Sequence, residues 1–232
     1  MIKAVFFDLY HTLIHYDPPR EESLSKVLAD SGIEVTADAL RRPMIVADEF
    51  IYQEHARLPM SKRSDDERKA LYTQYQIMLL KEAGINPTEE LIRSILFKMQ
   101  QIKFSRVLFD DVLPALNQLK QKGFILGLIS NVDSDITPLF DKLGLRQILQ
   151  VVVTSQDTGY YKPQPEIFEQ AARQAGVKAQ ESMYVGDQYQ IDVLGANRAG
   201  MQGVLLDRNG YFKEATEDLK IKNLYHLVEY LS

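Results

Sequence analysis

The sequence predicts an α/β fold in which a doubly wound parallel sheet is interrupted by an all-helical insert. Short apolar runs rich in β-branched residues alternate with segments of helical spacing in the second half of the chain. Glycines stand where most of these helices should end. Residues 18–104 show helical spacing and no strand pattern, so they are expected to form the insert.

The elements before and inside the insert follow from local patterns. Residues 3–7 are apolar and stop at Asp8, which predicts a buried strand with an acid at its carboxyl end. Residues 18–104 predict about four helices. The expected breakers between these helices are Gly32, Pro43, Pro59, Gly84 and Pro87. The expected N-caps are Thr36, Ser64 and Thr88.

Strands and helices alternate after the insert. Strands are expected over residues 124–130, 149–154, 183–186 and 203–206. Helices are expected over residues 112–121 and 136–143, between Pro165 and Gly176, through Ala196 up to Gly200, and over residues 224–231. Such alternation predicts a parallel sheet with helices on both faces.

Composition excludes several classes of protein. The 232 residues are 45% hydrophobic and 25% charged, a mix that argues against disordered and fibrous chains. A net charge of -5 argues against nucleic acid as the main partner but leaves room for a small anionic substrate. The absence of cysteine excludes disulfides, zinc–thiolate sites and cysteine nucleophiles.

The sequence also bears on location and assembly. The first residues lack the layout of a signal peptide. Apolar stretches such as residues 123–132 are far shorter than the ~18 residues that a membrane helix needs. We therefore expect a cytoplasmic protein without membrane contact, either a monomer or a homodimer.

Polar residues follow the predicted strands in a recurring way. They are Asp8 after the first strand, Ser130 and Asn131 after the next, Lys162 a little past the third, and Asp187 with Asp192 after the fourth. Each alone has a simpler interpretation as a helix cap, a turn residue or a solvated loop residue. In an open parallel sheet, however, ligands bind at the carboxyl ends of the strands, so the full set predicts a functional site.

These residues resemble the four motifs of the haloacid dehalogenase-like hydrolase superfamily. Residues 8–13, Asp-Leu-Tyr-His-Thr-Leu, match the first motif, and Ser130 matches the second. Lys162 matches the third, and Gly186-Asp187 with Asp192 downstream matches the fourth. The insert stands where the family places its cap domain. The resemblance implies a Rossmann-like core over residues 1–15 and 106–232 and a helical cap over residues 16–105.

The resemblance also implies roles. Asp8 would be a covalent nucleophile, Ser130 and the backbone N–H of Asn131 would hold an anionic oxygen, and Lys162 would neutralise Asp8 and the substrate. Asp192 would orient Lys162 or a water on the metal. The implied catalytic residues are Asp8, Tyr10, Thr12, Ser130, Asn131 and Lys162. The implied ligands of Mg²⁺ are Asp8, the backbone carbonyl of Tyr10, Asp187 and Asp192.

Two positions point to different reactions. Family phosphatases carry a second Asp where this chain has Tyr10, and a phenol is a poor proton shuttle at neutral pH. Tyr10 therefore favours dehalogenation or phosphates with good leaving groups, unless it only packs and contributes its carbonyl. Asp187 favours a metal, because three acids and Lys162 sum to -2 and a divalent cation brings that sum to zero.

Three functions follow in order of preference. The first is Mg²⁺-dependent hydrolysis of a phosphate ester or acyl phosphate through an aspartyl intermediate. The second is metal-independent dehalogenation of a 2-haloacid. The third is a non-catalytic binding module on the same fold, which the presence of both Asp8 and Lys162 disfavours.

Overall fold

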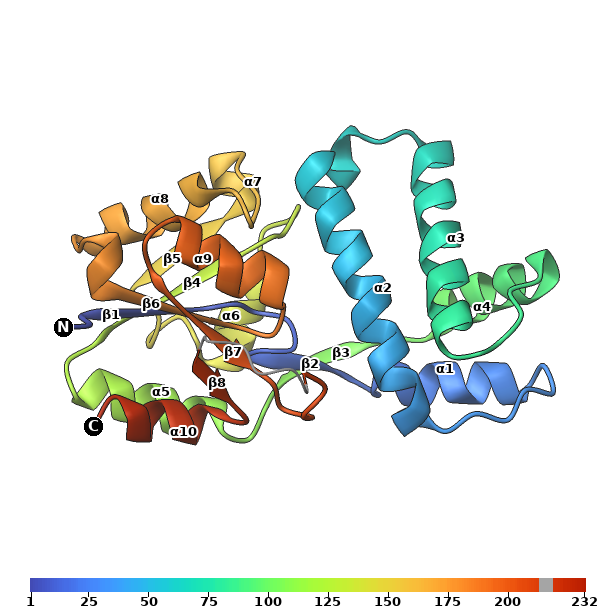
Figure 1. Cartoon of the computed structure of the whole chain (residues 1–232), viewed down its shortest axis with the longest axis horizontal. Coiled ribbons are helices and arrows are strands. Elements are labelled where there is room, and N and C mark those ends of the chain that lie inside the picture. Colours follow the sequence, from blue (N-terminus) through green and yellow to red (C-terminus); the bar gives the residue numbers. More distant parts are fainter. Residues whose placement is uncertain (213–218) are drawn as a thin grey trace. The chain divides into compact units, whose positions relative to one another are not determined.

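The computed structural model describes residues 1–212 and 219–232, and the chain divides into two compact units (Figure 1). One unit, which we call the core unit, comprises Met1–His15 and Leu108–Ser232. The other, the helical unit, comprises Tyr16–Val107. That the helical unit acts as a cap stays a prediction.

A parallel sheet forms the centre of the core unit. Its order is β5-β4-β1-β6-β7-β8, and every neighbouring pair runs parallel. The strands are β1 (Ala4–Phe7), β4 (Ile125–Ser130), β5 (Val151–Thr154), β6 (Ser182–Gly186), β7 (Gln202–Leu206) and β8 (Leu219–Ile221). The predicted parallel sheet is confirmed, with β8 as an additional edge strand that the sequence pattern did not reveal.

The strand order reverses around β1. The chain runs from β1 to β4 and β5 on one side, and then to β6, β7 and β8 on the other. Helices cannot cover such a switch point continuously, so the carboxyl ends of the strands that flank it border a crevice where ligands bind. Those strands here are β4, β1 and β6.

Helices cover both faces of the sheet (Figure 1). On β1, Val5 and Phe7 join a first core cluster with residues of α5 and α10, whereas Ala4 and Phe6 join a second core cluster with residues of α8 and α9. This alternation is the side-chain period of a strand buried on both faces. The helices are α5 (Val112–Gln121), α6 (Thr137–Leu143), α7 (Ser155–Thr158), α8 (Pro165–Ala175), α9 (Leu194–Arg198) and α10 (Leu224–Tyr230). The predicted doubly wound fold is confirmed.

The helical unit contains four α-helices around its own hydrophobic cluster. They are α1 (Arg20–Ala29), α2 (Ala37–Arg57), α3 (Asp65–Glu82) and α4 (Glu89–Gln101), with a 3₁₀ turn η1 (Met60–Lys62) between α2 and α3. The three predicted N-caps are confirmed: Thr36, Ser64 and Thr88 each accept a hydrogen bond from a backbone N–H of the first turn. Each bond satisfies a donor that the helix itself leaves unpaired.

Pro43 corrects one expectation. We expected it to separate two helices, but it lies inside α2. Leu40, Met44 and Ala47 on either side of it are buried in the cluster of the helical unit. Burial of this apolar stripe outweighs the backbone hydrogen bond that a proline inside a helix removes.

Two short strands were also missed. β2 (Ile14–Asp17) and β3 (Ser105–Leu108) form a separate two-stranded sheet. Each has only four residues and most of them are at least partly exposed. Four residues are too few to show the alternation of apolar and polar residues that identifies a half-buried strand.

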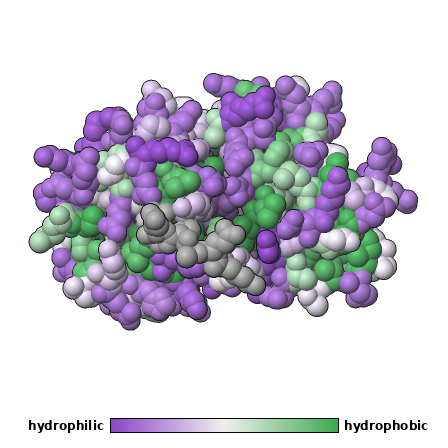
Figure 2. Space-filling model, viewed as in Figure 1, coloured by the Kyte–Doolittle hydropathy of each residue, from purple (hydrophilic) through white to green (hydrophobic). Residues whose placement is uncertain are grey.

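The surface carries no long apolar element among the described residues. No helix in residues 1–212 or 219–232 combines the length and apolarity needed to cross a membrane. On the face shown in Figure 2, hydrophobic side chains form patches separated by hydrophilic ones.

Candidate active site

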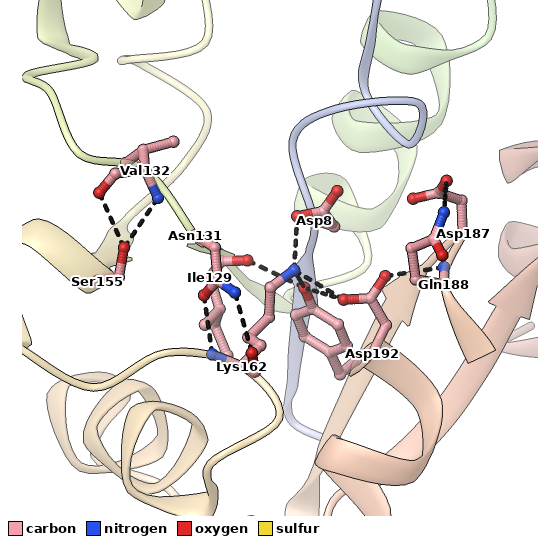
Figure 3. Close-up of polar contacts among 10 residues, drawn as sticks. Asp8, Ile129, Asn131, Val132, Ser155, Lys162, Asp187, Gln188 and Asp192 are labelled. Atoms are coloured by element: carbon pink, nitrogen blue, oxygen red, sulfur yellow. Dashed lines mark hydrogen bonds and ion pairs between the residues drawn. The ribbon is translucent and has the colours of Figure 1, made fainter. Parts of the chain in front are cut away.

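Residues at the carboxyl ends of three adjacent strands meet at the switch point. Asp8 follows β1, Ser130 ends β4, and Asp187 follows β6. Lys162 reaches the same place from the loop before α8, and Asp192 reaches it from a π-helical turn, η3 (Tyr189–Val193) (Figure 3). The fold thus brings together the acids and the lysine that the sequence singled out.

Lys162 is the centre of the arrangement. Its Nζ donates to Asp8 Oδ1 at 2.7 Å and to Asp192 Oδ1 at 2.7 Å (Figure 3). A third bond, of 2.8 Å, goes to the hydroxyl of Tyr184. Lys162 is only 3% exposed and Asp192 only 1%. Buried charges of this kind are tolerated because they are paired and hydrogen-bonded.

Three carboxylates gather around that single ammonium. Asp8, Asp187 and Asp192 each offer an oxygen, and these oxygens lie within 4.8 Å of one another. Together with Lys162 we call them the Lys162 cluster. Its formal charge is three negatives against one positive, which is -2. Such a group of hard oxygen donors can hold a metal ion.

Burial and the neighbouring acids both raise the pKa values of Asp8 and Asp187. The pKa of Asp8 is raised to about 6, mainly because the carboxyl group is buried. Lys162 opposes this rise, and Asp192 adds to it. Burial, followed by Asp192 and Asp8, raises the pKa of Asp187 well above its usual range. Burial lowers the pKa of Lys162, but Asp192 and Asp8 outweigh this effect and leave it raised. Lys162 is therefore charged, but its single positive charge offsets only part of the effect that burial has on Asp8 and Asp187.

The backbone of the fourth motif explains its glycine. A Cβ on Gly186 would stand 2.2 Å from Asp192 Oδ2 and 2.4 Å from its Cγ. The Asp192 carboxylate cannot easily yield, because Oδ1 accepts from Lys162 and Oδ2 accepts from the backbone N–H of Gln188 at 3.0 Å. Glycine is required here because the carboxylate lies directly against the strand.

Gln188 also steadies the neighbouring acid. Its Nε2 donates to Asp187 Oδ2 at 3.1 Å (Figure 3). Gln188 thus contacts both Asp187 and Asp192, one through its side chain and one through its backbone. Gln188 was not among the site residues expected from the sequence, because neither its residue type nor its spacing distinguishes it from a loop residue.

Asn131 holds the loop that carries the lysine. Its Nδ2 donates to the carbonyl of Lys162 at 3.0 Å, and its Oδ1 accepts from the backbone N–H of Lys162 at 2.8 Å (Figure 3). A second clamp lies nearby, where Ser155 Oγ accepts from the N–H of Val132 and donates to its carbonyl. These paired bonds tie the segment after β4 to the segments that follow β5. Ser130 itself is 1% exposed.

The other residues of the first motif lie in the core. The Tyr10 side chain packs against the first core cluster. Thr12 is fully buried, and its Oγ1 has no hydrogen-bond partner among residues 1–212 and 219–232. The Thr12 carbonyl accepts from Arg208 Nη2 at 2.9 Å, and Arg208 in turn pairs with both oxygens of buried Asp111. Arg208 and Asp111 thus fix the turn that follows Asp8, a link the sequence did not indicate.

Several known proteins and one family model are similar to this chain. A family model described as haloacid dehalogenase-like hydrolase matches residues 2–200. A glyceraldehyde 3-phosphate phosphatase of Methanopyrus kandleri is 32% identical over 216 residues, which cover 91% of this chain and 86% of the relative. A ribulose-1,5-bisphosphate 5-phosphatase of Halopiger xanaduensis is 25% identical over 217 residues, covering 89% and 85%. The crystal structure of a 2-haloacid dehalogenase from Pseudomonas syringae pv. Tomato is 28% identical, with a TM-score of 0.56 and coverage of 100% and 98%.

Proposed function

This chain belongs to the haloacid dehalogenase-like hydrolases, and from that premise we propose that it is a Mg²⁺-dependent phosphatase of small phosphate esters or acyl phosphates. The observation that carries the proposal is the Lys162 cluster. Its three carboxylates and one ammonium would repel a phosphate dianion, and a divalent cation removes that repulsion.

The donor set fits Mg²⁺, which prefers carboxylate and carbonyl oxygens to nitrogen or sulfur. Asp8 and Asp187 would hold it, together with the backbone carbonyl of Tyr10. Asp192, whose oxygens accept from Lys162 and Gln188, would contribute charge beside them. When bound, the ion supplies positive charge to the phosphoryl oxygens during transfer.

The chain's own residues would carry out the transfer. An oxygen of Asp8 attacks phosphorus, and the bond between phosphorus and the alcohol oxygen breaks, so that the alcohol leaves as its alkoxide or phenolate and takes its proton from water. Ser130 and the backbone N–H of Asn131 hold a phosphoryl oxygen while Lys162 keeps the Asp8 carboxylate in place. Water then hydrolyses the acyl phosphate, which releases inorganic phosphate and restores the carboxylate.

The two phosphatase relatives suggest where to look for a substrate. Both are named for small phosphorylated sugars, so we propose a phosphomonoester of this class. The test is phosphate release from p-nitrophenyl phosphate and from a panel that includes glyceraldehyde 3-phosphate. We expect release with Mg²⁺ and none in EDTA. Absence of release from every member of the panel would contradict the proposal.

Tyr10 should limit the choice of leaving group. It stands where an acid would protonate the departing alkoxide, and p-nitrophenolate needs no such help. We expect Tyr10→Asp to speed hydrolysis of alkyl phosphates more than hydrolysis of p-nitrophenyl phosphate. An equal or opposite effect on the two substrates would show that position 10 has no part in proton transfer.

Tyr10 also keeps a second reaction open. A halide leaves without a proton, and a structural neighbour at 28% identity is titled a 2-haloacid dehalogenase. In that case the chain would release chloride from 2-chloropropionate at the same rate with and without EDTA. We place this reaction second because it leaves the charge of Asp187 unexplained.

We further propose that residues 16–105 are the cap that closes on the substrate. Closure would exclude water from the site until the aspartyl intermediate forms. Protease cleavage at the segments where the chain passes between its two units should then slow in the presence of Mg²⁺ and vanadate. An unchanged cleavage rate would count against closure.

A further inference from the structure

Tyr184 is a polar residue of the site region that the mechanism above does not use. It lies within β6 and is fully buried, and its ring packs edge-on against Phe168 with 5.1 Å between the ring centroids. Its hydroxyl lies 2.8 Å from Lys162 Nζ, 2.9 Å from the carbonyl oxygen of Ile129 and 3.3 Å from Asp192 Oδ1. Ile129 belongs to β4, directly before Ser130.

The hydroxyl completes the coordination of the ammonium. A lysine ammonium has three N–H donors. In this site Asp8 Oδ1, Asp192 Oδ1 and the Tyr184 hydroxyl accept them, at 2.7, 2.7 and 2.8 Å. Every donor of Lys162 is therefore used within the protein, and none is left to point at a substrate oxygen.

The hydroxyl is itself anchored. It has one hydrogen, and its shorter contact with an acceptor is to the Ile129 carbonyl. Donation to that carbonyl leaves the lone pairs of the oxygen free to accept from Lys162. A chain of hydrogen bonds thus runs from the β4 backbone through Tyr184 to the ammonium and on to Asp8.

We propose that Tyr184 is a positioning residue: its hydroxyl, as the third acceptor, fixes the position of the Lys162 ammonium so that one N–H stays on Asp8 Oδ1. Without this third acceptor, one N–H of the buried ammonium has no partner in the site, so Nζ is free to move toward another acceptor and away from Asp8 Oδ1. The Asp8 carboxylate then loses a fixed partner. Displacement of a reacting group by about 1 Å lowers rates by about 100-fold.

The catalytic consequence rests on the proposed function and has a specific form. Tyr184 touches no substrate in this account, because the phosphoryl group is bound by the metal, Ser130 and the N–H of Asn131. We therefore expect Tyr184→Phe to lower kcat for p-nitrophenyl phosphate by about 10- to 100-fold. The KM should stay within about threefold, since ground-state binding is not altered.

Two control variants separate positioning from packing. Tyr161→Phe removes a hydroxyl next to Lys162 in sequence, but that hydroxyl donates to Asp133 at 2.9 Å. Phe168→Leu loosens the packing of the Tyr184 ring and leaves its hydroxyl in place. We expect both controls to keep kcat within about threefold, with Phe168→Leu lowering the melting temperature at least as much as Tyr184→Phe.

A second measurement does not depend on activity. In ¹⁵N-lysine-labelled protein, an ammonium held by three buried acceptors exchanges its hydrogens slowly and gives a ¹H–¹⁵N signal, which Lys162→Met identifies by its loss. Tyr184→Phe should broaden that signal beyond detection, and Tyr161→Phe should leave it.

These readouts have distinct outcomes. If the wild type hydrolyses no phosphate ester but the Lys162 signal depends on Tyr184, the proposed phosphatase function fails and the positioning role stands. If Tyr184→Phe keeps wild-type kcat, or keeps the ammonium signal, the positioning role is overturned. A fall in kcat that Phe168→Leu reproduces would also overturn it, because packing would then explain the loss.

Discussion

The core unit and the helical unit each bury an ionic cluster, and the two clusters differ in how their charges balance. In the core unit, Asp8, Asp187 and Asp192 share one cation, Lys162. The pKa values of Asp8 and Asp187 are raised, because burial disfavours their charge and a single lysine compensates for only part of it.

The helical unit pairs its charges one to one. Arg20 donates to both carboxylate oxygens of Asp48, which is 6% exposed, and the hydroxyl of Tyr75 donates to Asp48 Oδ1 at 3.0 Å. One guanidinium and one carboxylate cancel, and the phenol fills a remaining acceptor site. Burial, followed by Asp48, raises the pKa of Tyr75, so this hydroxyl stays a donor.

The contrast indicates where function lies. A balanced buried pair is satisfied by its own partners and needs nothing from solution. An unbalanced cluster is costly to keep unless a ligand supplies the missing charge, and such perturbed groups gather at functional sites. The surplus of acid around Lys162 is therefore the feature that a metal and a phosphate would use.

The largest expected effect comes from Asp8, the proposed nucleophile of the unbalanced cluster. Asp8→Asn should lower phosphatase kcat by at least about 1000-fold, because the amide cannot form the acyl phosphate. The melting temperature in EDTA should not fall, since one of three crowded negative charges is removed. Steady-state kinetics and thermal unfolding of the same preparation test both parts. Retention of activity would remove Asp8 from the mechanism.

The second largest effect is expected at Gly186, where a Cβ would clash with the Asp192 carboxylate. Gly186→Ala places a methyl group against the Asp192 carboxylate, and we expect kcat to fall by about 100-fold. Gly127→Ala in β4 is a matched control, because its methyl group meets the Phe6 ring and not the cluster. Gly127→Ala should have a lower melting temperature than the wild type. The molecules that remain folded should keep the wild-type kcat. Equal kinetic losses in the two variants would mean that the glycine serves only the sheet.

Breaking the balanced pair should affect stability. Asp48→Asn leaves the guanidinium of Arg20 without a counter-charge, and because that side chain is 24% exposed we expect a loss of about 2 kcal/mol in the free energy of unfolding. Asp38→Asn removes an acid of the same unit that is 83% exposed, and it should cost less than about 0.5 kcal/mol. Urea unfolding measures both. An Asp48→Asn protein as stable as the wild type would show that the pair contributes nothing.

The smallest effect is a pH dependence of the metal-free protein. The pKa of Asp8 is about 6 in the folded chain against 3.8 for an ordinary Asp, so between these values the folded state holds a proton that the unfolded state releases. Stability from this group is therefore present at low pH and is lost as pH rises through about 6. In EDTA, the melting temperature should fall between pH 5 and pH 7 by more in the wild type than in Asp8→Asn. An identical pH profile for the two proteins would contradict the assignment.

Several site residues could be predicted from the sequence, because the carboxyl ends of parallel strands lie at the same edge of the sheet. Asp8, Ser130 and Asp187 each follow an apolar run, and the sheet order places those runs side by side. The resemblance to the family, which is now confirmed, added the roles expected of these residues and the interpretation of the helical insert as a cap. These features are local in sequence or repeated in register, so a pattern can reveal them.

Other features arise only in three dimensions. Tyr184 lies in a buried strand, and its residue type predicts core packing. Its hydroxyl nevertheless accepts a hydrogen bond from Lys162, which lies in the loop before α8. Arg208 and Asp111 lie far apart in the sequence, but the fold pairs them directly and lets Arg208 also donate to the carbonyl of Thr12 in the turn after Asp8. Pro43 shows the opposite failure, where a strong local signal was outweighed by burial of its helix.

The Lys162 cluster holds three carboxylates and one ammonium, and we propose that it takes up a divalent cation. Isothermal titration of the EDTA-treated, dialysed protein with Mg²⁺ tests it most directly. We predict saturable binding at one site in the wild type, with heat that Asp187→Asn abolishes and Asp48→Asn preserves. Absence of binding in the wild type, or binding that survives Asp187→Asn unchanged, would contradict the account.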